Sequence, residues 1–124
     1  MLLCFEGIDG SGKSTQAELL VEYFQQLNKQ VVLTAQPTKH TLGKIIREAF
    51  AKKIILQEPT IAALFAADRL EHILNEEEGI LHQLKENNIV ISDRYYFSSY
   101  AYHSVHVPMN WVIESNKLAA QLCK

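Results

Sequence analysis

The sequence predicts an α/β fold in which a parallel β-sheet is flanked by helices in three layers. Short apolar runs alternate with longer stretches in which apolar residues recur every three or four positions. The first apolar run ends in a glycine-rich turn that leads directly into such a stretch. Alternating strands and helices favour parallel pairing of the strands. With 124 residues, 48% of them hydrophobic, the chain suits one domain, which we expect to cover residues 1–124.

The first half of the chain predicts two strand–helix pairs. Leu2–Phe5 is a short apolar run, typical of a buried strand. From Ser14 to Lys29 the apolar residues follow helical spacing and form one face. Val31–Leu33 is short and rich in β-branched residues, so we expect a second strand, which Pro37 ends. A second helix is expected over Thr41–Lys53.

The second half predicts helices around one further strand. Pro59 stands where a helix would begin, and helical spacing continues to about Asn75. Helical character then resumes and ends at Asn87-Asn88, a plausible cap. Ile89–Ile91 is the third expected strand. A single last helix is expected over Asn110–Gln121.

Composition narrows the possible partners and compartments. The formal net charge is -2, which gives no electrostatic reason to expect nucleic-acid or membrane binding. No apolar run approaches the length of a membrane span, and no basic leader is visible. Cys4 lies in an apolar run, so we expect a buried free thiol, and Cys123 is far away in sequence. Together these features favour a cytoplasmic protein.

The turn after the first strand matches a phosphate-binding motif. Gly7–Ser14 fits G-x-x-x-x-G-K-[ST] at every fixed position, between an expected strand and an expected helix. Glycines let backbone N–H groups face an anion, Lys13 can reach the β- and γ-phosphates of ATP, and the Ser14 hydroxyl can bind Mg²⁺. The alternative is a glycine turn with a solvated lysine. The expected phosphate-binding set is Gly7, Asp9, Gly10, Ser11, Gly12, Lys13, Ser14 and Thr15.

Two charges follow the third strand. Asp93 and Arg94 come at the carboxyl end of a buried run, where open α/β sheets bind ligands. We expect Asp93 to join Ser14 as a Mg²⁺ ligand and Arg94 to neutralise phosphate charge in the transition state. The alternative is a structural ion pair. None of the five histidines has partners at the spacing of a zinc site.

An ordered set of motifs resembles the thymidylate kinase family, which transfers a phosphoryl group from ATP to dTMP. The set covers nearly the whole chain and is more specific than the P-loop alone, which identifies only a superfamily; the fold it implies is that of a P-loop kinase. The matching stretches are Phe5–Gln16, Thr34–Thr38, Leu42–Arg47, Leu64–Arg69, Asp93–Tyr95, Ser98 and Ala101-Tyr102.

The resemblance assigns roles to several side chains. It implies that Phe65 stacks on thymine and that Arg69 donates hydrogen bonds to the base; spacing alone would instead favour a core Phe and a surface Arg. It places Asp9 near the acceptor sugar and phosphate; the alternative is an aspartate that shapes the loop through hydrogen bonds to its own turn. Tyr102 would lie beneath the deoxyribose, or else be a half-buried core tyrosine. The expected catalytic residues are Lys13, Arg94 and Asp9, and the substrate-binding residues are Asp9, Lys39, Phe65, Arg69, Arg94, Ser98, Tyr102 and His103.

Three departures from the family pattern bear on function. Ala35 and Gln36 stand where the family commonly has Arg-Glu, and Lys39 is a candidate replacement cation for the acceptor phosphate. His103 stands where many members have Gln. Family members continue with another strand, an arginine-bearing lid and an adenine-binding segment, so we expect a fragment or a short relative.

Three alternatives for function and assembly stay open at this stage. The scaffold also suits a kinase for another nucleotide or nucleoside, and a nucleotide-binding relative without catalysis. An apolar sheet edge would favour association, so we also consider a homodimer.

Overall fold

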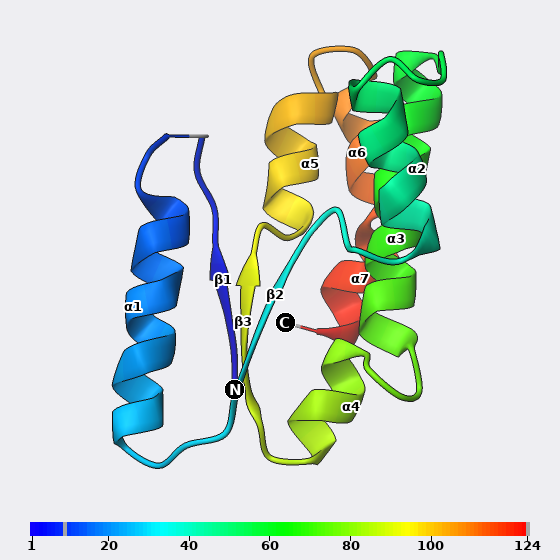
Figure 1. Ribbon diagram of the computed structural model, residues 1–124. Helices are drawn as coiled ribbons and strands as arrows, with labels where there is room; N and C mark the ends of the chain where they lie inside the picture. The colour runs from blue at the N-terminus through cyan, green and yellow to red at the C-terminus, as the bar shows by residue number, and fades with distance from the viewer. Residues whose placement is uncertain (9, 124) are drawn as a thin grey trace.

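A parallel sheet of three strands lies at the centre of the described part of the chain (Figure 1). The computed structural model describes residues 1–8 and 10–123. The strands are β1 (Leu2–Phe5), β2 (Val31–Ala35) and β3 (Ile89–Asp93), in the spatial order β1-β3-β2. β3 is therefore central, and Val90 lies beside a residue of each neighbour. β2 and β3 each run two residues past their predicted ends, so Asp93 closes β3.

Helices cover both faces of the sheet, which confirms the three-layer α/β prediction. The first helix, α1 (Lys13–Gln26), lies alone on one face, and α3 (Glu58–Leu74) lies on the other side (Figure 1). No described helix is long and apolar enough to cross a membrane. The other helices are α2 (Thr41–Phe50), α4 (Ile80–Lys85), α5 (Tyr96–His103), α6 (Met109–Ser115) and α7 (Lys117–Leu122).

The main core cluster lies on the α3 side of the sheet. Three of its members are fully buried side chains: Val90 of β3, Ile73 of α3 and Ile80 of α4. Tyr95, two residues after β3, and Ala119 of α7 also belong to this cluster. Because β3 is covered in this way, the backbone that carries Asp93 and Arg94 is anchored in the core.

In the last third of the chain one helix was not predicted and one helical prediction was wrong. Residues 96–103 form α5, which the sequence did not suggest because its aromatic and serine residues are weak helix formers. The single helix expected over Asn110–Gln121 is two helices that meet at Asn116. Asn116 is buried, and its amide donates to the Val112 carbonyl, a local bond that competes with a continuous helix.

The predicted burial of Cys4 was also wrong. Cys4 is exposed rather than buried, because β1 is an edge strand that pairs only with β3. Leu19 and Tyr23 of α1 are about half exposed, at 52% and 55%, because α1 packs against a narrow sheet with Ala17 as its buried residue. Cys123 is a buried free thiol.

Candidate active site

The phosphate motif forms a tight loop between β1 and α1. Gly10 and Gly12 have φ angles of 82° and 87°, in the left-handed region that side chains with a Cβ rarely adopt. Gly12 is the residue before α1, so the loop feeds directly into the positive end of that helix. The loop walls a hollow of about 330 Å³. It is lined by Ile8, Gly10, Gly12, Lys13, Ser14 and Thr15.

Three side chains converge where this loop meets the end of β3. The Lys13 ammonium forms an ion pair with one Asp93 oxygen, and the Ser14 hydroxyl donates to the other oxygen at 3.2 Å. These residues are about 80 positions apart in sequence, and the parallel pairing of β1 with β3 brings them together. The cluster therefore offers one cation and two oxygen ligands at the mouth of the phosphate loop.

Arg94 follows Asp93 in an unusual backbone conformation. Its φ is 75°, which is uncommon for a residue with a side chain. Its N–H donates to the Phe5 carbonyl at 2.8 Å, and its carbonyl accepts from Ser92 Oγ at 2.8 Å. The guanidinium reaches α5, where Nη1 donates to Ser98 Oγ at 3.3 Å and Cζ lies 5.2 Å from the centre of the Tyr102 ring. Arg94 thus points from the strand end toward α5.

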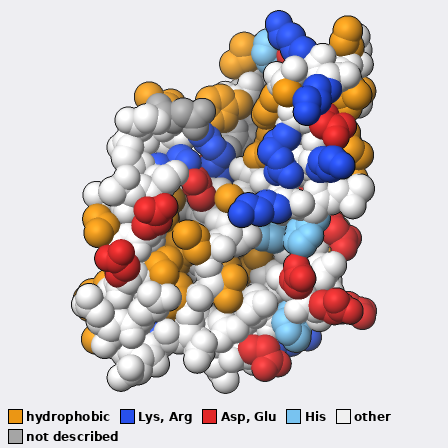
Figure 2. Space-filling view, in the orientation of Figure 1, with side chains coloured by type: hydrophobic (Ala, Val, Ile, Leu, Met, Phe, Trp, Pro, Cys, Tyr) orange, Lys and Arg blue, Asp and Glu red, His pale blue; other side chains and the backbone are white. Residues whose placement is uncertain are grey.

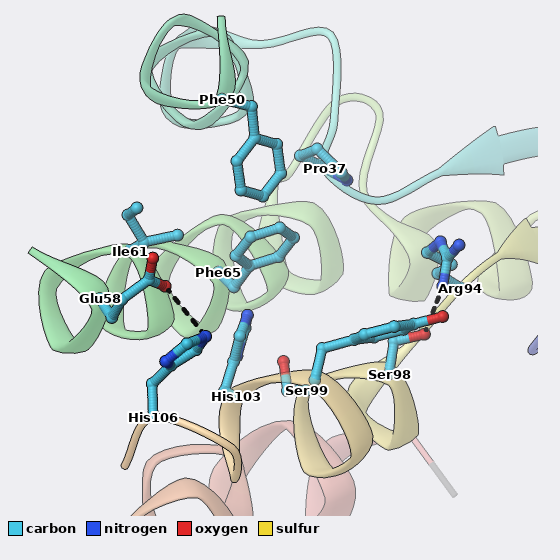
Figure 3. A pocket seen from close by; sticks show the side chains of 11 residues that line it. Pro37, Phe50, Glu58, Ile61, Phe65, Arg94, Ser98, Ser99, His103 and His106 are labelled. Atoms are coloured by element: carbon cyan, nitrogen blue, oxygen red, sulfur yellow. Dashed lines mark hydrogen bonds and ion pairs between the residues drawn. The ribbon is translucent and has the colours of Figure 1, made fainter. Parts of the chain in front are cut away.

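A cavity of about 510 Å³ opens between α3 and α5, next to Arg94 (Figure 3). The Phe65 ring of α3 lies at its centre, 5.8 Å from the Phe50 ring and 4.8 Å from the His103 ring between centroids. At the far rim, His106 Nε2 lies 3.9 Å from Glu58 Oε2. The cavity therefore combines flat aromatic walls with one cation. It is lined by Pro37, Phe50, Glu58, Ile61, Phe65, Arg94, Ser98, Ser99, Tyr102, His103 and His106.

His103 is a neutral wall of this cavity. Burial lowers the pKa of its imidazole from 6.5 to about 4, so the ring carries no charge at neutral pH. Its Nδ1 is buried and has no hydrogen-bond partner among the residues that the structure describes. In Figure 3 the ring rises from α5 toward Phe65.

Arg69 lies behind the cavity wall rather than on it. It is 1% exposed, and its Nε donates to Gln36 Oε1 at 2.8 Å. Its Nη1 donates to Ser99 Oγ at 2.9 Å and to the side-chain oxygen of Asn116. Burial lowers its pKa to about 10, so the guanidinium still carries its charge at neutral pH. Because Ser99 lines the cavity, Arg69 contacts this wall through one hydroxyl.

A second buried histidine completes this polar network. Gln36 lies 3.0 Å from His72 Nδ1, and Thr34 Oγ1 lies 2.7 Å from His72 Nε2. Burial lowers the pKa of His72 to about 4, which fixes a neutral ring between two polar partners. Gln36, which stands where the family commonly has glutamate, thus joins Arg69 to His72 through a neutral amide.

Lys39 lies in a neighbouring groove and not in the Phe65 cavity. This groove, of about 690 Å³, also contains Ser14, Asp93 and Arg47, so it adjoins the phosphate loop. Figure 2 shows Lys and Arg side chains gathered on this face, in the upper middle and over α2. The predicted role of Lys39 at the acceptor phosphate stays a prediction.

The structure brings most of the predicted site residues to one edge of the sheet. Phe65, Arg94, Ser98, Tyr102 and His103 share the cavity, where Tyr102 is 45% exposed. The predictions for Asp9 lie outside the described residues. Contributors that the sequence did not suggest are Glu6, Phe50, Glu58, His72, Ser99, His106 and Asn116.

A family model for thymidylate kinase matches residues 5–121. The chain belongs to the thymidylate kinase family. A probable thymidylate kinase from Pyrococcus horikoshii is 43% identical over 123 residues, and a putative thymidylate kinase from Treponema pallidum is 43% identical over 113 residues. The alignments cover 94% and 91% of this chain.

A solved structure supports the same assignment at the level of the fold. The crystal structure of thymidylate kinase from Ehrlichia chaffeensis matches 96% of this chain with a TM-score of 0.82 and 35% sequence identity. This chain covers 67% of that chain, 58% of the Pyrococcus relative and 53% of the Treponema relative. The chain therefore spans little more than half the length of the curated relatives named here.

Proposed function

We propose that this protein transfers the γ-phosphoryl group of ATP to dTMP, giving dTDP. The observation that carries the proposal is the position of Arg94, which lies between the phosphate loop and the aromatic cavity. Its backbone follows Asp93, whose carboxylate contacts Lys13, while its guanidinium lines the Phe65 cavity. A cation in this position can contact the donor and acceptor phosphates together. Phosphoryl transfer depends mainly on such positioning and on charge neutralisation.

On the donor side, the loop N–H groups and Lys13 hold the phosphates of ATP. Ser14 Oγ and the Asp93 carboxylate are hard oxygen ligands of the kind that Mg²⁺ takes. Ser14 Oγ lies 3.2 Å from Asp93 Oδ2. These ligands are few, which suits Mg²⁺ because this ion keeps water and phosphate oxygens as further ligands. When bound, Mg²⁺ would screen the charge of the β- and γ-phosphates.

On the acceptor side, the aromatic cavity holds the base and sugar. Phe65 offers its ring face to a flat base, and Tyr102 stands beside Arg94, where a deoxyribose would approach. Ser99, held by Arg69, presents a hydroxyl to the cavity wall. In this proposal Arg69 affects base binding through Ser99, whose hydroxyl it holds from behind the cavity wall.

A second candidate function is a kinase for another acceptor. The observation that favours it is His103, a neutral imidazole packed 4.8 Å from the Phe65 ring, where many family members have glutamine. An imidazole and a glutamine offer different hydrogen bonds to the edge of a base, so the two residues favour different acceptors.

The test is to incubate the protein with Mg-ATP and with dTMP, dUMP, dGMP or thymidine in turn, and to follow ADP formation. We expect turnover with dTMP. Turnover with a different acceptor alone would keep the kinase and overturn the substrate. ATP binding with no turnover for any acceptor would contradict the enzyme and leave a nucleotide-binding protein.

A further inference from the structure

The carboxylate of Glu6 links the start of the phosphate loop to the start of α5. Glu6 lies between β1 and Gly7 in the chain. Its Oε1 accepts a hydrogen bond from the Tyr95 N–H at 2.7 Å, and its Oε2 accepts one from Ser98 Oγ. Tyr95 is the residue before α5 and Ser98 lies in its first turn, so one side chain holds the beginning of that helix.

Ser98 passes the effect of Glu6 on to Arg94. A serine hydroxyl has one proton to donate and two lone pairs with which it can accept. Here Ser98 Oγ donates its hydrogen bond to the Glu6 carboxylate, and the same Ser98 oxygen accepts a hydrogen bond from Arg94 Nη1 at 3.3 Å. Glu6 therefore fixes the orientation in which Ser98 accepts from Arg94.

The backbone of Arg94 needs such support. A non-glycine residue with a φ of 75° is held there by its surroundings, and such strain often accompanies a functional position. The bonds from Arg94 N to Phe5 O and from Ser92 Oγ to Arg94 O hold the peptide groups. Glu6 adds a bond to the next N–H, that of Tyr95, and a bond to the hydroxyl that receives the guanidinium.

We propose that Glu6 is a positioning residue, which sets the direction of the Arg94 guanidinium between the phosphate loop and the acceptor cavity. The inference rests on the proposed function. Glu6 is exposed, so its charge is screened by solvent and its effect comes through hydrogen-bond direction rather than through long-range attraction. The link also couples the two halves of the site, because the same residue precedes the donor loop and holds the acceptor helix.

The variant Glu6→Gln tests this directly and keeps the size of the side chain. The glutamine carbonyl can still accept from the Tyr95 N–H, but its NH₂ group must face Ser98, which reverses the direction of that bond. We expect kcat to fall and the KM for dTMP to rise, each by about tenfold, while the KM for ATP changes by less than about twofold. Glu22→Gln, at an exposed glutamate of α1, is the matched control and should change none of them.

A double-mutant cycle separates positioning from general damage. In the Arg94→Ala background Glu6→Gln should cost no further kcat, because the group that it directs is gone. Additive losses would mean that Glu6 acts independently of Arg94 and would contradict the proposal.

A measurement without substrate keeps the test independent of the proposed function. Nuclear magnetic resonance of the Arg94 side-chain Nε–H in the ligand-free protein should show a rigid group in the wild type and a mobile one in Glu6→Gln. An unchanged Arg94 signal would overturn the positioning role even if dTMP is the substrate. A loss of order in the variant would support the positioning role even if no acceptor is turned over, in which case only the proposed function would fall.

Discussion

The phosphate loop and the acceptor cavity are built in opposite ways. The loop is a continuous stretch, Gly7–Thr15, whose described part needs little beyond its own glycines and the start of α1 to take its shape. The cavity draws residues from α2, α3 and α5 and from the loops that follow β2, β3 and α5, and its wall is held from behind by a buried polar network. The first region depends on local conformation, and the second depends on tertiary packing.

This difference decides how each region should respond to substitution. A change in the loop removes a group that contacts a ligand but leaves the core intact. A change in the network behind the cavity leaves a buried polar group without a partner, which affects stability as well as binding. The predictions below separate these two responses.

The largest effect is expected for Lys13→Met. Loss of the cation that meets Asp93 at the phosphate loop should lower kcat for phosphoryl transfer about 10³-fold, because charge on the transferred group is no longer neutralised. Steady-state ADP formation with dTMP measures this. Calorimetric titration with dTMP should show binding within about twofold of the wild type, because the aromatic cavity does not include Lys13. A variant that also loses dTMP binding would show that the two regions are not separable.

The loop was predictable from sequence because its conformation is local. The glycines with positive φ and the helix that follows them are encoded within nine consecutive residues. The order of strands and helices was predictable for a similar reason, since apolar spacing within each segment reports its type. Thus β1, α1 and the buried β3 all appear close to their expected positions.

The cavity was less predictable because its determinants are distant in sequence. Arg69 is separated by 33 positions from Gln36 and by 47 from Asn116, and nothing in the local pattern links them. The break at Asn116 was missed because its burial and its side-chain bonds to Arg69 and to the Val112 carbonyl are features of the folded structure that the local sequence pattern does not reveal. Glu6 lies in a stretch that resembles the family, but its contacts were not predictable, since its partners lie 89 and 92 positions away. Resemblance to a family identified Phe65 and Tyr102, which spacing alone did not.

An intermediate effect is expected for Arg69→Met. The substitution keeps a long side chain but leaves Gln36, Ser99 and Asn116 without their donor in a buried site. The free energy of unfolding should fall by about 3 kcal/mol, measured by urea denaturation at neutral pH. Binding of dTMP should weaken and ATP binding should be retained, the reverse of Lys13→Met. Lys29→Met, at an exposed lysine, should stay within about 0.5 kcal/mol of the wild type. Equal stability of the two variants would mean that the network does not hold the wall.

The smallest effect concerns pH and the buried imidazole of His72. Burial lowers its pKa from 6.5 to about 4, so between these values the unfolded chain binds a proton that the folded protein does not. The stability that comes from the neutral ring is therefore fully present above pH 6.5 and is lost as pH falls toward 4. From pH 7 to pH 5 this single group should lower the free energy of unfolding by about 2 kcal/mol.

His72→Gln removes the titrating ring while keeping a polar side chain near Thr34, so the free energy of unfolding of this variant should fall less over the same interval. Urea denaturation of both proteins at the two pH values measures the difference, with His82→Gln, at a ring that does not act on the His72 pKa, as the control. Parallel pH profiles for wild type and His72→Gln would show that the ring is not held neutral, and the network behind the cavity would then lack the rigid neutral link that joins β2 to α3.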